Sequence, residues 1–517
     1  MDALVILIPL LPLLAAVMIG GGQLMGWLRG ASGNTLAADI ATGSIYLACM
    51  MSLTLLGADL MGKNHGFFSV GQWLGSDSLN IRLNFICTGF NVHLATLFAV
   101  LFAIVGRFSA NNRDKEAESN RYFTLLSLFT SAMLLMVLSA NQVLTLIGWI
   151  CTSVCAYFLI GYSGQPIKTA NATRVLISHR IGDIGFIIGI SLSYAWLDSV
   201  NWYNLKMAAE QLTIGEATGI SLCFTLAAAA KSAQLPFTPW LVRAMDGQMP
   251  VTATLCGAML AHAGVFLVLL SEPVFSQSPF ALAVLGLVGF ATTIYSYIVA
   301  KTQTDRHSTL AFAISGQLGL MFLTCSLGFW DLATWYLYVH IVIRCYQCLT
   351  IASEQRHVEK SSNQRLSRPD STGIYILSLQ HFWLEQLTDW ALVNPIRGLA
   401  HDLSYFDDHV VDRIMGVPAP AIGTLTSLAQ AEEVLIGTEL DRKIEGFSRS
   451  NGLVGKLAEC SAALMHWFES RIVLNGIGKH RWHQRRQFGH AINKFEQMIL
   501  RPRYLVLFVC FTFLIAF

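Results

Sequence analysis

Residues 226–240 read Leu-Ala-Ala-Ala-Ala-Lys-Ser-Ala-Gln-Leu-Pro-Phe-Thr-Pro-Trp, an apolar run in which a single lysine, Lys231, precedes two prolines. The small residues before the lysine allow neighbouring helices to approach closely within a membrane. Pro236 and Pro239 break a helix just after the charge, because proline lacks the amide donor of an inner helical turn. Broken membrane helices commonly line ion pathways. The stretch therefore predicts a transmembrane helix that is interrupted beside a buried charge.

The composition of the whole chain agrees with a membrane location. Of 517 residues, 54% are hydrophobic and 13% are charged, whereas soluble globular chains carry about 25% charged residues. Too few polar side chains remain to cover a water-facing exterior. The net charge of +2 gives no indication of nucleic-acid binding. The chain contains no motif for a nucleotide or a catalytic metal, and Cys345-x-x-Cys348 has no second pair to complete a metal site. We therefore expect neither a cofactor nor an enzymatic activity of its own.

The apolar segments predict an all-α, polytopic transmembrane bundle of about twelve helices. A helix needs roughly 20 apolar residues to cross the hydrocarbon core. The predicted spans are 3–27, 37–61, 88–107, 122–140, 143–163, 176–198, 217–246, 251–271, 279–300, 308–328, 331–353 and 503–517. Three parts follow from this count: a bundle of residues 1–353, a polar helical segment of residues 354–502, and a C-terminal transmembrane helix of residues 503–517.

Basic residues predict the orientation of the chain. The connections after odd-numbered spans are rich in lysine and arginine, and those after even-numbered spans are poor in them. The positive-inside rule then predicts a multi-pass protein of the cell inner membrane, with the N-terminus outside and residues 354–502 in the cytoplasm. Within that segment, residues 382–393 are amphipathic, which is typical of a helix that lies on a membrane or on a partner protein. A solvated domain that packs on itself would explain the pattern equally well.

Ionisable residues inside the spans are candidates for function, because burying charge in a bilayer is costly. Lys231 is the first candidate, since a lysine removed from water can exchange a proton near neutral pH. A lysine that reaches the membrane surface at a helix end is the alternative. His179, Arg180 and Asp183 form the second group; Arg180 and Asp183 are three residues apart and can pair on one helix face. An interfacial salt bridge with a purely structural role is the alternative there.

The third group combines His262 in the eighth predicted span with Tyr336, His340 and Arg344 in the eleventh. His340 lies four residues from both Tyr336 and Arg344, so the three share a helix face. Histidine titrates near physiological pH and suits a proton relay. Arginine stays charged, so Arg344 is interpreted as a fixed charge that biases its neighbours. Histidines in membrane helices can also serve only as packing residues.

The stretch from Lys231 to Val251, KSAQLPFTPWLVRAMDGQMPV, closely resembles the signature of the antiporter-like subunits of respiratory complex I and of Mrp antiporters. Residues 148–149, 157–161, 180–183 and 310–319 also match, and the resemblance extends over roughly residues 80–350. A weaker match to the tail of the subunit L branch occurs at residues 394–397 and 407–412. The resemblance implies a helical bundle that passes protons along a line of lysines, histidines and a glutamate, with Pro236 and Pro239 at the helix break.

Several positions depart from that pattern. Ile150 stands where the resemblance implies a glutamate next to the Gly-Trp pair, a residue that would pair with Lys231. Cys256 occupies the usual histidine position of the eighth helix, and His262 follows two turns later. In the eleventh span, Tyr336, His340 and Arg344 replace two histidines and a lysine. The second broken helix of the family, with its own lysine, has no counterpart after residue 353.

These departures favour a resemblance to the membrane subunit of two-component inorganic-carbon accumulation complexes. That resemblance implies a peripheral partner similar to a zinc β-carbonic anhydrase, which a cation gradient through this chain would energise to hydrate CO2 to bicarbonate. A proton-translocating subunit of complex I or of an Mrp-type antiporter is the alternative, and a non-conducting scaffold is a third. Protons are the favoured ion, because carboxylates are scarce in the spans and sodium prefers oxygen ligands.

Overall fold

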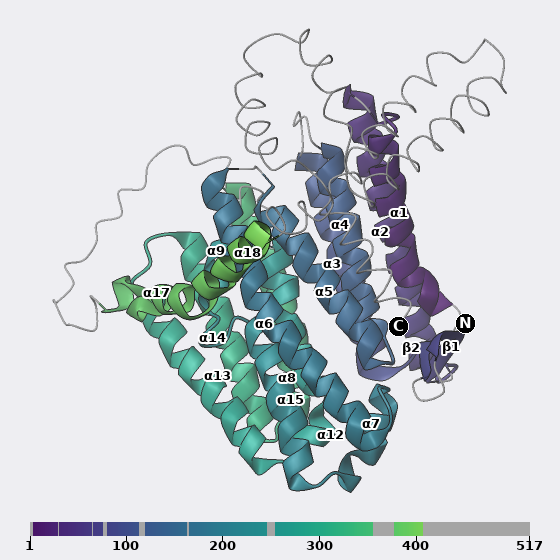
Figure 1. Ribbon diagram of the computed structural model, residues 1–517. Helices are drawn as coiled ribbons and strands as arrows, with labels where there is room; N and C mark the ends of the chain where they lie inside the picture. The colour runs from purple at the N-terminus through teal and green to yellow at the C-terminus, as the bar shows by residue number, and fades with distance from the viewer. Residues whose placement is uncertain are drawn as a thin grey trace, which may run out of the picture. The chain divides into compact units, whose positions relative to one another are not determined.

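The computed structural model describes residues 4–28, 30–64, 66–75, 80–112, 119–162, 165–245, 254–354 and 377–406. Eight helices in this part of the chain are long and apolar enough to cross a membrane. The predicted polytopic helical bundle is thereby confirmed (Figure 1). Contacts divide the chain into two compact units, Met1–Gln23 with Trp27–Val393, and Leu24–Gly26 with Asn394–Phe517.

The first unit contains every element described except α18, and the elements follow the order of the chain. Its N-terminal part consists of α1 (Leu4–Leu24), α2 (Gly30–Leu60), strands β1 (Phe67–Gly75) and β2 (Asn80–Ile86), α3 (Gly89–Asn112), α4 (Ser119–Leu138), α5 (Gln142–Ile160) and α6 (Pro166–Leu197). The central part comprises α7 (Trp202–Ala208), η1 (Ala209–Gln211), α8 (Ile214–Lys231), α9 (Pro239–Met245), η2 (Thr254–Met259), η3 (Leu260–His262), α11 (Ala263–Leu270) and α12 (Glu272–Phe275).

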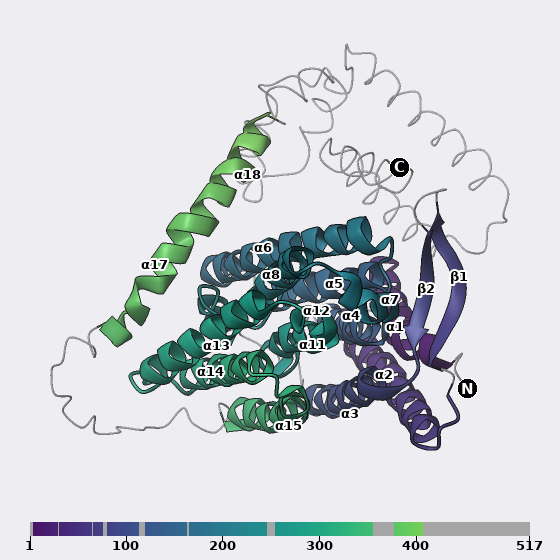
Figure 2. The same ribbon diagram turned by 90° about the horizontal axis from the view of Figure 1, so that it is seen from below.

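The remaining elements of this unit are α13 (Pro279–Ala300), α14 (Arg306–Ser326), α15 (Trp330–Glu354), η4 (His381–Trp383), α17 (Leu384–Thr388) and η5 (Asp389–Val393). Helix α18 (Asn394–Phe406) belongs to the second unit. Several helices pack as close neighbours, as Figure 2 shows for α13 with α14 and for α6 with α8.

The predicted spans within residues 1–353 each coincide with helical structure. The span predicted at 217–246 is α8, a break and α9, and the span predicted at 251–271 is a π-helical turn, a 3-10 turn and α11. The helix predicted at 503–517 and the tail motif at 407–412 lie outside the described residues. The all-α prediction missed one hairpin. Strands β1 and β2 pair in antiparallel fashion with two register shifts.

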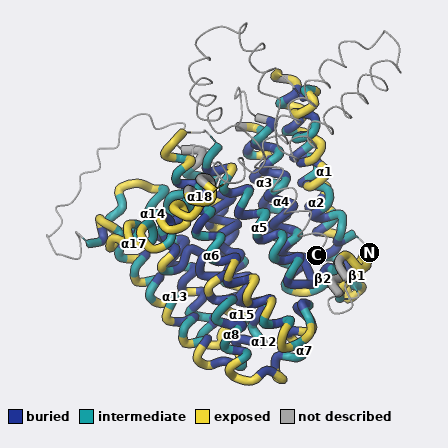
Figure 3. The backbone as a smooth tube through the Cα atoms, in the orientation of Figure 1, coloured by how far each residue is buried: buried dark blue, intermediate teal, exposed yellow. Residues whose placement is uncertain are grey.

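The outer surface of the bundle is apolar, and its interior holds the polar groups. Large side chains on α6 and α13 are exposed, among them Ile184, Ile187, Leu287 and Phe290, and Figure 3 shows buried and exposed faces alternating along these helices. A helix that is apolar on its exposed face suits a lipid environment. The same helices bury Asp183, which lies on the inward face of α6 at 3% exposure.

Two glycines allow the helices around the site to approach closely. A side chain at Gly148 would collide with the backbone of Ala132 and Met136 in α4, so α5 and α4 pack backbone to backbone there. A side chain at Gly264 would overlap the Ala228 carbonyl and the Ser232 hydroxyl. Small residues give membrane helices this close contact. The first contact fixes α5 against α4, and the second fixes α11 against α8, the helix that ends at Lys231.

Candidate functional site

The break predicted after Lys231 is present, and its backbone is held by neighbouring side chains. Helix α8 ends at Lys231, Ala233 adopts a left-handed conformation with φ 51°, and α9 begins at Pro239 after a cis Leu235–Pro236 bond. The Ser315 hydroxyl donates to the Ala233 carbonyl at 2.7 Å. The Thr292 hydroxyl accepts from the Leu235 amide at 3.0 Å. Backbone groups freed within a membrane must find such partners, so the break is a fixed feature of the bundle.

The Lys231 ammonium is buried and is held by neutral oxygens of α5. Its Nζ donates to the Trp149 carbonyl at 2.7 Å, to the Ser153 hydroxyl at 2.6 Å and to the Thr152 hydroxyl at 3.2 Å. The side chain is 1% exposed, and Nζ lies 4.8 Å from the centre of the Trp149 ring. Three donors meet three acceptors, so the hydrogen-bonding capacity of the ammonium is filled. Among the described residues no carboxylate lies within ion-pair distance of Nζ.

The carboxylate of Asp183 lies on the other side of Trp149 from Lys231 in the hydrogen-bond network. The indole Nε1 donates to Asp183 Oδ1 at 2.9 Å, and Asp183 Oδ2 lies 2.7 Å from Arg180 Nη2. Asp183 is thus shared between a neutral donor and a charged one. Because the carbonyl of Trp149 accepts from Lys231, this one residue contacts both the carboxylate and the ammonium. The predicted pairing of Arg180 with Asp183 is present on α6, beside Lys231.

His179 lies next to this cluster but bonds to none of it. Its ring is 1% exposed, and neither ring nitrogen has a hydrogen-bond partner among the described residues. The ring meets Trp240 of α9 edge to face, with centroids 4.6 Å apart. A buried imidazole without a partner is unusual, since buried polar side chains generally find one.

The second cluster joins α15 to the irregular turn before α11. His262 Nε2 lies 2.7 Å from His340 Nδ1, and Arg344 Nε donates to His340 Nε2 at 2.9 Å. Arg344 also donates to Gln317 of α14 at 2.7 Å and to Gln347 at 2.6 Å. Tyr336 packs its ring edge to face on His340, with centroids 5.8 Å apart.

The donor inventory of this cluster fixes where the protons lie. Arginine Nε always carries a hydrogen, so His340 Nε2 must accept. A neutral His340 then carries its proton on Nδ1 and donates it to His262 Nε2. His262 in turn carries its proton on Nδ1, which is buried and has no partner among the described residues. The two neutral histidines therefore form an oriented row of hydrogen bonds that begins at a permanent cation.

The residues predicted from the sequence thus form two groups rather than one continuous line. Lys231, Arg180 and Asp183 meet around Trp149, and His262, His340, Arg344 and Tyr336 meet around α15. Among the described residues no hydrogen bond joins Lys231 to either histidine. Sequence reasoning did not assign Thr152, Ser153, Gln317 or Gln347, although polar residues in apolar helices were the available signal.

The part of the chain that the structure describes contains no group of three or more histidine, cysteine, aspartate or glutamate side chains arranged to hold a metal ion. The cysteines Cys345 and Cys348 are both buried and free.

Comparison with known proteins finds a family match in the central region of the chain. Residues 139–368 match the family model described as NADH:quinone oxidoreductase/Mrp antiporter, transmembrane. The chain is 32% identical to NADH-quinone oxidoreductase subunit L of Buchnera aphidicola over 316 residues, which are 60% of this chain and 51% of that protein. It is 27% identical to subunit L of Escherichia coli over 359 residues, 68% of this chain and 57% of that protein. The chain spans about half the length of these curated relatives.

Solved structures agree on the fold. The Mrp complex from Dietzia sp. superposes with a TM-score of 0.61 at 20% identity, covering 69% of this chain and 38% of that chain. The membrane-bound sulfane sulfur reductase, an archaeal respiratory membrane complex, gives a TM-score of 0.58 at 15% identity, covering 69% of this chain and 57% of that chain. At such identities the likeness establishes the arrangement of helices.

Proposed function

We propose that this chain is a proton-translocating membrane subunit of a multi-subunit complex, of the kind found in complex I and in Mrp antiporters. The observation that carries the proposal is the Lys231 site. A charged ammonium is buried there among neutral oxygens, and no carboxylate in the described chain neutralises it directly. Such a group can lose its proton without leaving a counter-ion unpaired. The family match over residues 139–368 supports the same function.

The residues would have distinct roles in this function. Lys231 takes up and releases the transported proton. Asp183, through the Trp149 indole, stabilises the charged form at a distance, and Arg180 keeps Asp183 ionised. The histidines His262 and His340 provide the next proton-exchanging groups. Arg344 stays charged, holds His340 by a hydrogen bond and sets the direction of the histidine row, with Tyr336 packing against it.

Proton flux into vesicles that contain the purified native complex tests the proposal. A pH-sensitive dye inside the vesicles would report flux in the parent chain, and Lys231→Ala should reduce it about 100-fold, the usual contribution of a positioned proton-transfer group. Lys206→Ala is the matched control, because Lys206 is an exposed lysine of α7. Unchanged flux in Lys231→Ala would favour a non-conducting scaffold instead.

A finer proposal concerns the partner. Ile150 removes the acidic residue that the family resemblance implies beside Lys231, which supports a chain adapted to another complex. In that complex, the chain would energise a peripheral zinc-containing protein similar to a carbonic anhydrase, which would hydrate CO2 to bicarbonate. Purification from the native membrane tests it. A two-protein particle that contains zinc would support it, whereas co-purified redox or antiporter subunits would assign the chain to the alternative.

The orientation is part of the same proposal. Four basic residues lie near the end of the bundle where α6 and α14 begin: Lys168, Arg174, Lys301 and Arg306. By the positive-inside rule, that end would face the cytoplasmic side of the inner membrane. Residues 377–393 contact the same end, which supports a cytoplasmic location for them. Labelling a single cysteine introduced at Thr169 from one side of intact cells or of inverted vesicles tests this orientation.

A further inference from the structure

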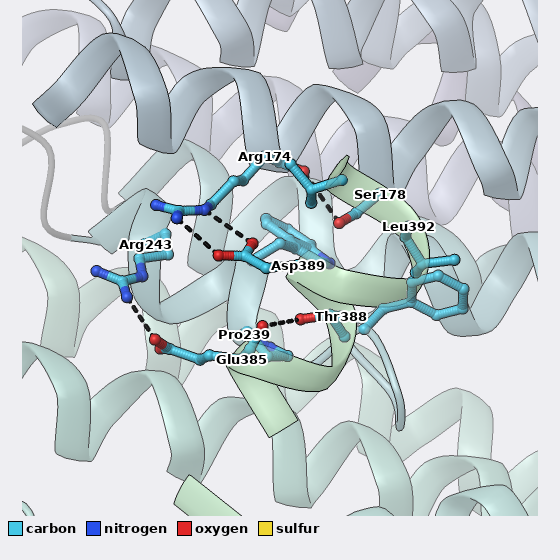
Figure 4. A pocket seen from close by; sticks show the side chains of 11 residues that line it. Arg174, Ser178, Pro239, Arg243, Glu385, Thr388, Asp389 and Leu392 are labelled. Carbon is cyan, nitrogen blue, oxygen red and sulfur yellow. Dashed lines mark hydrogen bonds and ion pairs between the residues drawn. The ribbon is translucent and has the colours of Figure 1, made fainter. Parts of the chain in front are cut away.

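A pocket lies where residues 381–393, here termed the cover segment, meet the ends of α6 and α9 (Figure 4). Two ion pairs hold the segment there. Arg174 of α6 binds Asp389 with two hydrogen bonds, Nε to Oδ1 at 2.9 Å and Nη2 to Oδ2 at 2.7 Å. Arg243 of α9 pairs with Glu385. Paired arginine–carboxylate bonds of this kind fix geometry as well as charge.

The cover segment is also anchored beyond the pocket. The Tyr295 hydroxyl of α13 donates to the His381 carbonyl at 3.2 Å, and Phe312 of α14 packs on the His381 ring. His381, Phe382 and Trp383 all have φ between 51° and 53°. Left-handed backbone is unfavourable for residues other than glycine, so this turn is held by its contacts. A segment strained at one end and ion-paired along its length can be released without unfolding the bundle.

The pocket contains room for water, and its walls combine charged and hydroxyl groups with apolar side chains. Its lining includes Ser178, Trp240 and Thr388 together with the four charged side chains of the ion pairs. The space open to the centres of water molecules is about 20 Å³. One ordered water needs at least roughly 10–15 Å³ by that measure. The pocket therefore admits a water molecule beneath the cover segment.

His179 lies directly behind this wall. Ser178 and Trp240 line the pocket. His179 follows Ser178 in the chain, and its ring packs edge to face on Trp240. Both of its ring nitrogens are buried without a partner in the described chain. Lys231 and Arg180 lie within electrostatic range of it. The unpartnered imidazole thus stands between the pocket and the Lys231 site.

We propose that the pocket is the aqueous entrance to the Lys231 site, that His179 is the first side chain to accept a proton there, and that the cover segment closes the entrance. The inference rests on the proposed function. A hydronium in the pocket gives its proton to a ring nitrogen of His179 and leaves as water. Once Lys231 has released its own proton, the imidazolium passes its proton inward to the neutral Lys231 amine and returns to the neutral form. The two ion pairs decide whether water reaches the pocket.

Thiol labelling tests the closure without relying on transport. In Ser178→Cys, a cationic methanethiosulfonate reagent should react slowly at residue 178, as followed by mass spectrometry of the peptide. Adding Glu385→Gln and Asp389→Asn should speed the reaction about 10-fold, since two partly exposed ion pairs are lost. Exchanging the charges, Arg174→Asp with Asp389→Arg, should restore slow labelling. Thr169→Cys, exposed on the same helix outside the pocket, should react at one rate in all backgrounds.

Fast labelling of Ser178→Cys in the parent background, or no acceleration after loss of both carboxylates, would overturn the cover. Should the neutralised variant misfold, Arg174→Lys with Arg243→Lys keeps the charges and removes the paired geometry. It should show an intermediate labelling rate, and the parent rate in this pair would count equally against the cover.

Chemical rescue tests His179. His179→Ala should lose proton flux, and added imidazole should recover at least part of it, because a small base can replace a missing proton acceptor but not a missing packing contact. His179→Phe, which keeps a ring against Trp240, is the control and should not be rescued. Full flux in His179→Ala excludes the role of His179 while leaving Lys231 in place. Loss of the proposed function would instead appear as undiminished flux in Lys231→Ala.

Discussion

The two buried clusters differ in the one property that matters for moving a proton, which is whether their charge can change. Around Lys231 the acceptors are a carbonyl and two hydroxyls, all neutral, and the nearest carboxylate acts through an indole. Around His340 the charge is an arginine, which does not release its proton. The first cluster can gain or lose a charge. The second carries a permanent one and adjusts the protons of its histidines around it.

The comparison also explains how the chain manages without a glutamate at position 150. Ile150 is only half-buried on α5, and Lys231 donates to the hydroxyls of Thr152 and Ser153 on the same helix. Hydroxyls satisfy the ammonium donors without balancing its charge. In the proposed function, the charge of Asp183 on α6 would therefore bias Lys231 across Trp149 rather than by a direct ion pair.

Replacing Lys231 by a residue that stays charged should have the largest effect on proton flux. Lys231→Arg keeps a positive charge of similar reach but cannot release a proton, so flux should fall about 100-fold, as for loss of a general acid–base group. Dye-loaded vesicles with the native complex give the measurement, and Lys206→Arg is the control. Flux near the parent level in Lys231→Arg would mean that both clusters carry fixed charges, and the contrast between them would disappear.

Removing the permanent cation of the second cluster should change the histidine tautomers. In the parent chain, nitrogen-15 NMR should find His340 protonated at Nδ1, because Nε2 accepts from Arg344. A hydrogen bond to a charged group contributes about 1.5–3 kcal/mol, so Arg344→Met should let the second tautomer appear. Arg344→Lys, which restores a charge without the Nε donor, separates the effect of charge from that of the bond. An unchanged spectrum in Arg344→Met would contradict the oriented row.

The transmembrane helices were predictable because each depends on local composition. Apolar length marks a span wherever it occurs, and Pro236 and Pro239 mark the break, since proline acts on its own turn of helix. The spacing of Arg180 and Asp183, or of His340 and Arg344, likewise follows from one helix. The β1–β2 hairpin was missed although Asn80–Ile86 alternates polar and apolar residues as a strand does. The pattern of β1 is weaker, because it contains Gly71 and Gly75 and is shifted twice in register against β2.

Contacts between distant helices were not predictable in the same way. His262 and His340 are 78 residues apart, and Lys231 meets a carbonyl 82 residues earlier. A carbonyl acceptor leaves no trace in the sequence, because every residue has one. The cover segment reaches Arg174 across 215 residues, and only its amphipathic character was visible. Local periodicity shows that a face is buried, but tertiary packing decides which residues meet on it.

A smaller effect is expected for the indole of Trp149, which lies between Asp183 and Lys231. Trp149→Phe removes the donor to Asp183 but keeps an aromatic ring against Phe186, and it leaves the backbone carbonyl that accepts from Lys231. A hydrogen bond of this kind contributes about 0.5–1.5 kcal/mol, so flux should change only several-fold. Asp183→Asn keeps an acceptor for the indole and isolates the loss of charge. If Trp149→Phe abolished flux as fully as Lys231→Ala, the indole would be an essential part of the path rather than a modulator.

The smallest effect is expected at the cover segment, whose charges differ from both clusters in facing water. Burial tends to raise the pKa of Glu385, but hydrogen bonds from His381 and Arg243 outweigh it and hold that pKa below its ordinary value of 4.5. Tyr295 is the other titratable group that faces it. A carboxyl with a lowered pKa stabilises the closed segment fully at pH values above that ordinary pKa, and this stabilisation is lost as the pH falls through the lowered pKa.

Hydrogen exchange of residues 381–393, with exposure times scaled for intrinsic rates, measures the closure. The exchange rate should stay constant from pH 7 to about pH 5 and rise a few-fold below, as expected for one partly exposed ion pair. Glu385→Gln should exchange faster at neutral pH and lose this dependence, and a rise already between pH 7 and pH 6 would contradict control of the closure by Glu385.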